Sequence, residues 1–166
     1  MQYTRDMKAI LVTTTFLASF GLLSLTPRTS RAEPPIKVGV RIGEYGDPYD
    51  RLFAGGDLNV PLGDHFYLDP ALEIVFVDHG SFFAIPVDLE YRIPIERRGR
   101  GFVWIGGGPD ILHGSGGGES KTELSADLQA GIGVHAGMTE PYVGLKYVFG
   151  TSDFDAAGVL TFGIRF

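Results

Sequence analysis

Two copies of the tripeptide His-Gly-Ser are the residues of this chain that most resemble a catalytic device. They are His79-Gly80-Ser81 and His113-Gly114-Ser115, and the carboxylates Glu90 and Asp127 follow them. A serine, a histidine and an acid together supply a nucleophile, a base and a group that orients the base. Both tripeptides, however, fall in segments with loop composition, where histidine, glycine and serine are ordinary residues. The prediction is therefore that the chain has no catalytic residues.

A second set of chemically capable residues consists of acids and bases that recur at every other position of alternating segments. Buried charges are costly unless they are paired, so these side chains are expected to form ion pairs with one another. The candidate network comprises Lys37, Arg41, Asp57, Glu73, Asp88, Glu90, Arg92, Asp127, Lys146 and Arg165, and Asp69 and Asp110 share its face. A structural network of paired charges is preferred here to an ion path that opens by exchange of salt bridges. No cofactor or metal site is predicted.

The elements that position these charges are predicted to be strands, because apolar and polar residues alternate with a period of two and no helical period persists. Short clusters of Gly, Pro and Asp separate the alternating segments, as turns require. Eight strands are expected, at Ile36 to Gly43, Leu52 to Leu62, Phe66 to Val77, Phe82 to Ile93, Phe102 to Leu112, Glu123 to Ala136, Tyr142 to Gly150 and Gly158 to Phe166. In the Gly-rich fifth strand, Val103, Ile105 and Ile111 are taken to face outward and Asp110 inward. The segment His113 to Thr122 is taken as a loop.

Alternation alone fits both a soluble barrel with an apolar interior and a membrane barrel with an apolar exterior. Three features favour the membrane barrel. The charged face is rich in Gly and Ala, which suits a narrow lumen, and the apolar face is uniformly large. The third feature is a gathering of aromatic residues near strand ends, as membrane interfaces favour. The expected girdles are Phe66, Tyr91, Phe102, Tyr142 and Phe166 on one side and Tyr45, Phe76, Phe83, Phe149 and Phe154 on the other. The predicted fold is an all-β, eight-stranded antiparallel up-and-down transmembrane β-barrel.

The first 32 residues are predicted to be a signal peptide of the Sec type. Arg5 and Lys8 precede an apolar stretch from Ala9 to Leu25, and Ser30-Arg31-Ala32 offers small residues where a signal peptidase reads. Cleavage before Glu33 leaves residues 33–166 as one barrel domain, with ten basic and nineteen acidic residues and a formal charge of −9. Such a negative balance argues against nucleic acid as a partner. The chain contains no cysteine.

Several segments resemble those of a known family of outer membrane proteins. They are Tyr142 to Tyr147, Ile85 to Tyr91, the turn Pro61 to Asp64 and the C-terminal Phe162 to Phe166. On these residues the chain resembles the small eight-stranded barrels of the OmpA/OmpX type, the outer membrane protein beta-barrel domain family. The resemblance implies a monomeric barrel in the outer membrane of a Gram-negative bacterium, surrounded by lipid and lipopolysaccharide. It also implies that Phe162, Ile164 and Phe166 mark an interfacial strand that the barrel assembly machinery reads.

The expected role is non-enzymatic, either in envelope integrity or in contacts at the cell surface. Two alternatives from other classes stay open at this point. One is a soluble periplasmic barrel, similar to a lipocalin, that binds a small apolar ligand. The other is a barrel enzyme that modifies lipid A and uses a histidine, a serine and an acid.

Overall fold

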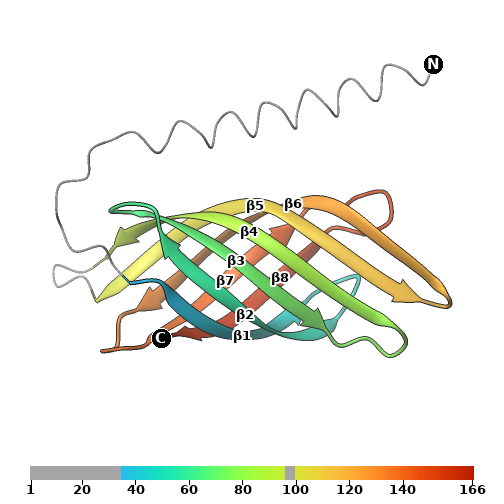
Figure 1. Ribbon diagram of the computed structural model, residues 1–166, viewed down its shortest axis with the longest axis horizontal. Helices are drawn as coiled ribbons and strands as arrows, with labels where there is room; N and C mark the ends of the chain where they lie inside the picture. The colour runs from blue at the N-terminus through green and yellow to red at the C-terminus, as the bar shows by residue number, and fades with distance from the viewer. Residues whose placement is uncertain (1–34, 96–99) are drawn as a thin grey trace, which may run out of the picture. The chain divides into compact units, whose positions relative to one another are not determined.

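The computed structural model describes residues 35–95 and 100–166, which form an antiparallel barrel (Figure 1). The predicted signal peptide lies outside the described residues. In the described part of the chain the strands are β1 (Lys37–Tyr45), β2 (Arg51–Pro61), β3 (Phe66–Val75), β4 (Ser81–Pro94), β5 (Gly101–Gly116), β6 (Glu119–Val134), β7 (Glu140–Val148) and β8 (Ala157–Arg165). Each strand pairs with its neighbours in sequence, and β1 pairs with β8 to close the barrel. The predicted all-β, eight-stranded fold is confirmed.

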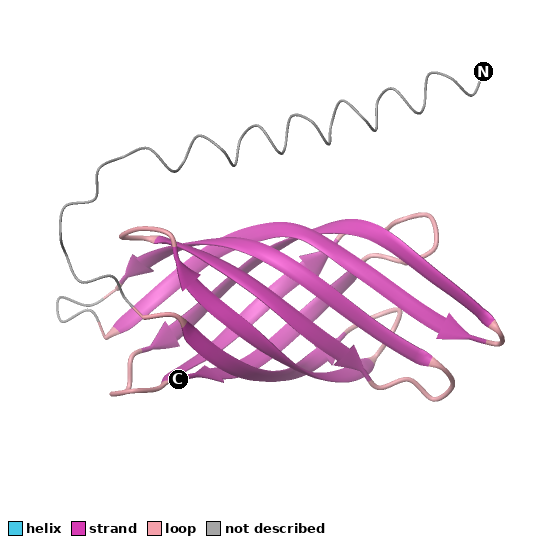
Figure 2. Cartoon of the chain, in the orientation of Figure 1, coloured by secondary structure: helices cyan, strands magenta, loops and turns pink. Residues whose placement is uncertain are grey.

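The connections fall into two groups at opposite ends of the barrel (Figure 2). The turn end contains residues 62–65 and 135–139 together with the end of β4 and the start of β5, and β1 begins and β8 finishes there. Residues 46–50, 76–80, 117–118 and 149–156 form the loop end. At the turn end, Val38 and Phe166 exchange backbone hydrogen bonds of 2.9 and 3.3 Å, which complete the seam between β1 and β8. Among the described residues, no helix is both long and apolar enough to cross a membrane.

The hairpin of β5 and β6 corrects one sequence expectation. Most of the predicted loop His113 to Thr122 continues the two strands, and only Gly117 and Gly118 form the turn. Both glycines have positive φ, at 62° and 88°. A two-residue turn of type I′ requires positive φ at both central positions, which glycine adopts without a Cβ clash. The apolar alternation stops before this turn, so a pattern based on hydrophobicity ends the strands too early.

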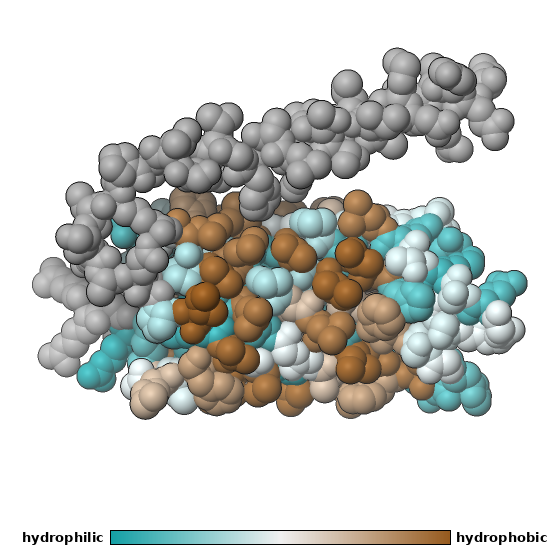
Figure 3. All heavy atoms as spheres, in the orientation of Figure 1, coloured by the Kyte–Doolittle hydropathy of each residue, from teal (hydrophilic) through white to brown (hydrophobic). Residues whose placement is uncertain are grey.

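The outer face of the barrel wall is apolar. Leu124, Leu145 and Ile42 expose 71%, 65% and 62% of their side chains, and the hydrophobic residues form a belt around the middle of the barrel (Figure 3). Polar residues gather beyond the belt at the loop end. The fifth strand faces as predicted, with Ile105 and Ile111 exposed and Asp110 fully buried. A water-soluble protein places such residues inside, so this belt matches the exterior of a membrane barrel.

The predicted aromatic girdles are partly wrong. Phe66, Phe76, Phe149 and Phe166 are exposed on the outer face, whereas Tyr45, Phe102 and Tyr142 point into the lumen with 5% exposure or less. Phe154 is partly buried against the apolar cluster inside the loop end. The inward residues stand on the same alternate positions as the charges of their strands. The position of a residue along a strand indicates its depth in the membrane. Whether its side chain points outward or into the lumen is fixed by the alternation of neighbouring residues along the strand.

Candidate functional site in the barrel lumen

An apolar layer fills the lumen at the loop end. It contains the buried residues Tyr45, Phe53, Val75, Ala84, Leu112, Val148, Ala157 and Val159. Tyr45 packs edge-on against Phe53 with ring centroids 5.5 Å apart, and its hydroxyl donates a hydrogen bond to Glu73 below the layer. Phe82 stacks on Tyr49 and contacts Phe154 at 5.5 Å. Sequence patterning predicted a lumen of charges and missed this layer, although its members lie on the inward positions.

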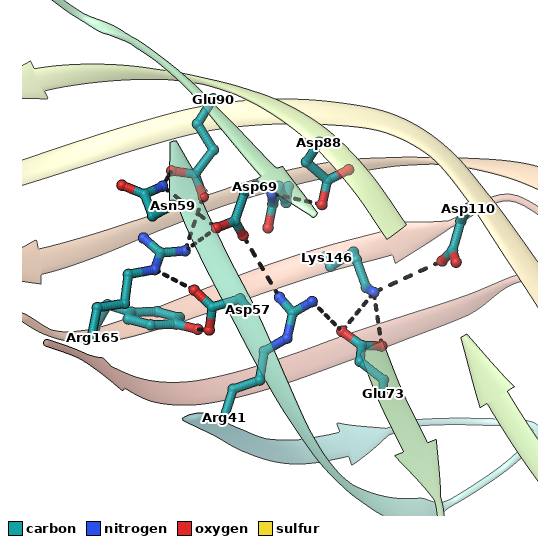
Figure 4. A network of polar contacts seen from close by, with 12 residues as sticks. Arg41, Asp57, Asn59, Asp69, Glu73, Asp88, Glu90, Asp110, Lys146 and Arg165 are labelled. Carbon is teal, nitrogen blue, oxygen red and sulfur yellow. Dashed lines mark hydrogen bonds and ion pairs between the residues drawn. The ribbon is translucent and has the colours of Figure 1, made fainter. Parts of the chain in front are cut away.

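Below the apolar layer, Glu73 of β3 joins two bases, one from β1 and one from β7. The Lys146 ammonium lies 3.0 Å from both oxygens of Glu73, and the Arg41 guanidinium lies 3.3 Å from one of them (Figure 4). Glu73 has no solvent exposure, and both bases are at least 95% buried. A fully buried carboxylate with two cations and a tyrosine hydroxyl has its lone pairs well occupied. This group is therefore a structural tie among β1, β3 and β7.

Arg165 of β8 is the centre of a second group of charges. Its guanidinium lies 2.5 Å from Asp57, 2.8 Å from Asp69 and 3.4 Å from Glu90 (Figure 4). Asn59, which the sequence analysis did not select, donates to Asp69 and Glu90 at 3.4 Å. One base thus connects β8 to acids on β2, β3 and β4, across the lumen. Such planar, multidentate contacts favour arginine over lysine.

At the turn end, Glu140 collects three donors. Lys37 lies 2.5 Å from its carboxylate, and Arg92 and His135 lie 2.9 Å from it. Arg92 also stacks over the rings of Tyr67 and Phe102, at 4.1 and 4.7 Å. Glu140 lies between the predicted strands that end at Ala136 and begin at Tyr142. In the structure it begins β7 and shares the inward positions of Tyr142 and Lys146. The even spacing of Glu140, Tyr142 and Lys146 could have predicted from the sequence that Glu140 faces the lumen.

His135 belongs to the turn between β6 and β7, beyond the spanning strands. Partial burial lowers the pKa of its imidazole below the usual value, although the nearby Glu140 carboxylate opposes this effect. With the ring neutral, its Nδ1–H can still donate to Glu140. His135 therefore adds a hydrogen bond to the turn end without adding a charge.

Inward glycines make room for aromatic rings in the narrow lumen. A Cβ on Gly131 would lie 2.2 Å from the Trp104 ring, and one on Gly163 would lie 2.3 Å from the Tyr142 ring. Trp104 and Tyr142 in turn pack edge-on with centroids 5.6 Å apart. The glycines noted in the sequence thus reflect close approach of rings to the barrel wall.

All ten residues of the candidate network lie in the lumen, with only Lys37 partly exposed. Eight of them form ion pairs, while Asp88 and Asp127 have no ion pair among the described residues. The C-terminal residues lie on the other side of the wall. Phe162 and Phe166 expose 48% and 56% of their side chains, and Ile164 is half-buried.

The two His-Gly-Ser tripeptides meet at the loop end but do not form a catalytic arrangement. Ser81 and Ser115 share a hydrogen bond of 2.8 Å, and His113 Nδ1 bonds instead to the Thr122 hydroxyl at 2.6 Å. Within residues 35–95 and 100–166, no hydrogen bond joins a serine hydroxyl to a histidine. Glu90 and Asp127 lie buried in the lumen. The serines therefore lack an adjacent base and acid.

Comparison with known proteins supports the fold. No protein-family model matches the chain, and no curated protein matches it in sequence. The N-terminal β-barrel domain of Pseudomonas aeruginosa OprF has a TM-score of 0.60 at 13% identity, over 79% of this chain and 96% of that one. Neisserial surface protein A has a TM-score of 0.59 at 9% identity, over 78% and 94%. The outer membrane enzyme PagL has a TM-score of 0.55 at 11% identity, over 78% and 97%. With its apolar exterior and charged lumen, the chain has the fold of the eight-stranded outer membrane β-barrels.

Proposed function

We propose that the protein is a non-enzymatic barrel of the outer membrane of a Gram-negative bacterium, with a role in envelope integrity or in contacts at the cell surface. The observation that carries the proposal is the polarity of the wall. Large apolar side chains cover the outside, and the charged residues are buried within. An apolar exterior of this kind is unfavourable in water and favourable in lipid. A closed barrel also pairs its backbone N–H and C=O groups in hydrogen bonds, as the interior of a bilayer requires.

The same polarity argues against a soluble barrel that binds an apolar ligand. Such a barrel needs an apolar pocket inside and polar residues outside. Here the middle of the lumen is filled by ion pairs. Glu73 pairs with Arg41 and Lys146, and Arg165 pairs with Asp69. The interior therefore offers charged groups where an apolar ligand requires hydrophobic ones.

Membrane fractionation tests the proposal directly. The protein should sediment with the outer membrane, require detergent for extraction, and change its mobility on SDS gels when it is boiled. Sequencing of the purified protein's N-terminus tests the proposed export signal, with Glu33 as the expected first residue. Recovery of the protein in the osmotic-shock fraction would favour the soluble alternative.

Enzymatic modification of lipid A is disfavoured by the arrangement of the serines. Ser81 and Ser115 bond to each other, and His113 bonds to Thr122. Mass spectrometry of lipid A can compare cells that lack the protein, cells that make the wild type and cells that make the variant with both serines replaced by alanine. The acylation pattern should be the same in all three. A change that appears with the wild type and disappears with Ser81→Ala or Ser115→Ala would identify an enzyme.

The proposed partners follow from the two ends and the belt. Lipid and lipopolysaccharide surround the belt, and the barrel assembly machinery reads the strand that ends at Phe166. At the loop end, Arg51 pairs with Asp78 and Lys121 pairs with Asp153. Further acids of this end, such as Asp50 and Glu119, are not engaged by these two bases, so the end carries an excess of negative charge. A surface partner of this end would therefore present cationic groups, or phosphates bridged by divalent cations. The barrel is proposed to be a monomer without a cofactor.

A further inference from the structure

The charges in the lumen do not balance. Among the described residues, five bases face the interior: Lys37, Arg41, Arg92, Lys146 and Arg165. Five acids each lie within 3.4 Å of one of these bases: Asp57, Asp69, Glu73, Glu90 and Glu140. Three more buried acids remain, Asp88, Asp110 and Asp127. An uncompensated buried carboxylate is costly, so this trio requires a further ligand.

The three carboxyl groups come from adjacent strands and expose 2% of their surface or less. In residues 35–95 and 100–166, neither oxygen of Asp110 or Asp127 has a hydrogen-bond donor, and Oδ1 of Asp88 also lacks one. Asp88 accepts a hydrogen bond from the Gln129 amide, at 3.0 Å. Lys146 lies 3.9 Å from Asp110, but its ammonium is held at 3.0 Å by Glu73. The trio therefore has few partners among the residues that the structure describes.

The strand register brings Asp88 and Asp127 together. Gly108 of β5 pairs with Asp127 of β6, and Gly107 pairs with Leu89 of β4, so Asp88 flanks Gly108 from the other side. Because Gly108 has no side chain, no side chain of β5 stands between the two residues at this register position. Neither oxygen of Asp127 has a donor among the described residues. Two ionised carboxylates have no hydrogen to donate to each other, so a hydrogen bond between these groups requires that one of them carries a proton.

We propose that Asp88 and Asp127 form a proton-binding site in the middle of the lumen and hold one proton between them. The titratable and charged groups around the pair are Arg41 from β1, Asp69 and Glu73 from β3, Asp110 from β5 and Lys146 from β7. Arg41 and Lys146 are already paired with Glu73, and Asp69 is paired with Arg165. The shared proton removes one of the unbalanced negative charges and ties β4 to β6 across Gly108.

Infrared spectroscopy of the full chain in detergent micelles at neutral pH tests the site. A protonated carboxyl group has a C=O stretch that is resolved from the carboxylate bands. The wild type should show this band. Asp88→Asn and Asp127→Asn should each lose it, because an asparagine amide donates to the remaining carboxylate without a proton. The heat-dependent gel shift of each variant checks that it has folded.

Two matched variants locate the proton. Asp153→Asn removes an exposed carboxylate of the loop end, and Asp110→Asn removes the third member of the trio, so both should retain the band. Absence of the band in the wild type, its survival in both Asp88→Asn and Asp127→Asn, or its loss in Asp110→Asn would each overturn the proposal. A wild type that lacks the band and gains thermal stability with added Na⁺ or Ca²⁺ would show that a cation occupies the place of the proton.

Discussion

At the scale of single residues, Arg165 carries the largest share of the lumen's electrostatic compensation. It contacts Asp57, Asp69 and Glu90, and its guanidinium also stacks over Tyr142 at 4.3 Å. Its side chain is 1% exposed. Water therefore does not replace these contacts when the base is removed. Asp57 then has no ion pair among the described residues, whereas Glu90 keeps Arg92 at 3.0 Å and Asp69 keeps Arg41 at 3.9 Å.

Replacing Arg165 by methionine should lower the free energy of unfolding by about 3–5 kcal/mol, the usual cost of leaving buried charges unpaired. Urea unfolding of the protein in lipid vesicles measures the change. Arg51→Met is the matched control, because Arg51 forms an exposed pair with Asp78 and should cost at most about 1 kcal/mol. Equal losses in the two variants would contradict the central role of Arg165.

Gly131 is a position where a single methyl group is expected to be harmful. An added Cβ would meet the Trp104 ring at 2.2 Å and the backbone oxygen of Val143 at 2.4 Å. Gly131→Ala should therefore destabilise the barrel by about 1–3 kcal/mol in the same urea assay. Gly158→Ala provides the control, since a Cβ there meets nothing within 4 Å. A stable Gly131→Ala variant would mean that Trp104 does not pack against this glycine.

His135 gives the turn end a dependence on pH. Its pKa is lower in the folded protein than the unfolded value of about 6.5, because burial disfavours the imidazolium. The unfolded chain therefore binds the proton more readily. The stability from this residue is present above about pH 6.5 and is lost as the pH falls through the folded pKa. Between about pH 8 and about pH 5, the urea midpoint should fall less in His135→Gln than in the wild type. His79→Gln should follow the wild type, and a His135→Gln profile that does so too would refute this assignment.

At the scale of elements, β8 has two different tasks on its two faces. Thr161 and Arg165 point into the lumen, whereas Phe162 and Phe166 point outward. The strand also closes the barrel against β1, and the hydrogen bonds between Val38 and Phe166 extend this seam. A change to Phe166, which directly follows β8, therefore leaves the lumen contacts in place and alters only the outer face.

Phe166→Ala should reduce the amount of folded protein in the outer membrane severalfold, if the terminal aromatic residue is the signal that we propose. Quantitative blotting of boiled and unboiled outer membrane samples measures this amount. Phe76→Ala removes an aromatic side chain of nearly equal exposure, 59% against 56%, at the other end of the barrel. Its assembly should stay near the wild-type level. A similar drop in both variants would indicate a general loss of interfacial anchoring.

At the scale of the whole molecule, the lumen is closed in layers. The apolar layer around Tyr45 and Phe53 fills the loop end, the groups around Glu73 and Arg165 fill the middle, and Glu140 with its donors fills the turn end. An eight-stranded barrel has an interior that side chains are large enough to fill. The layers make a continuous water path along the axis unfavourable.

Planar bilayer recordings of the wild type should therefore show no conductance steps of the size typical of a wide porin. Arg165→Met should show more frequent small openings, because it removes the base that contacts Asp57, Asp69 and Glu90 in the lumen. Large, stable steps in the wild type would show that the layers separate in the membrane and that the salt bridges act as a gate.

The sequence predicted the fold to a large extent, and the reason is the period of two. Residues such as Ile42 and Leu145 lie outside and Arg41 and Lys146 lie inside because neighbours along a strand face opposite sides of the wall. The girdle positions predicted for Tyr45, Phe102 and Tyr142 were wrong, because they rested on position along the strand instead of on this period. The end of the β5–β6 hairpin also escaped it, because Gly and Ser carry little hydrophobic signal.

The amino-acid sequence by itself determined the number of strands, the side of the wall for most residues and the absence of disulfides. It did not determine which charges meet. Arg165 reaches Asp57, Asp69 and Glu90 because barrel closure and the strand register bring β8 opposite β2, β3 and β4. Among the described residues, the same register leaves Asp88 and Asp127 without an ion pair and leaves Asp110 only a contact of 3.9 Å with Lys146. Facing is a local property of the chain, whereas partnership across a lumen is set by register and closure, which only the tertiary structure fixes.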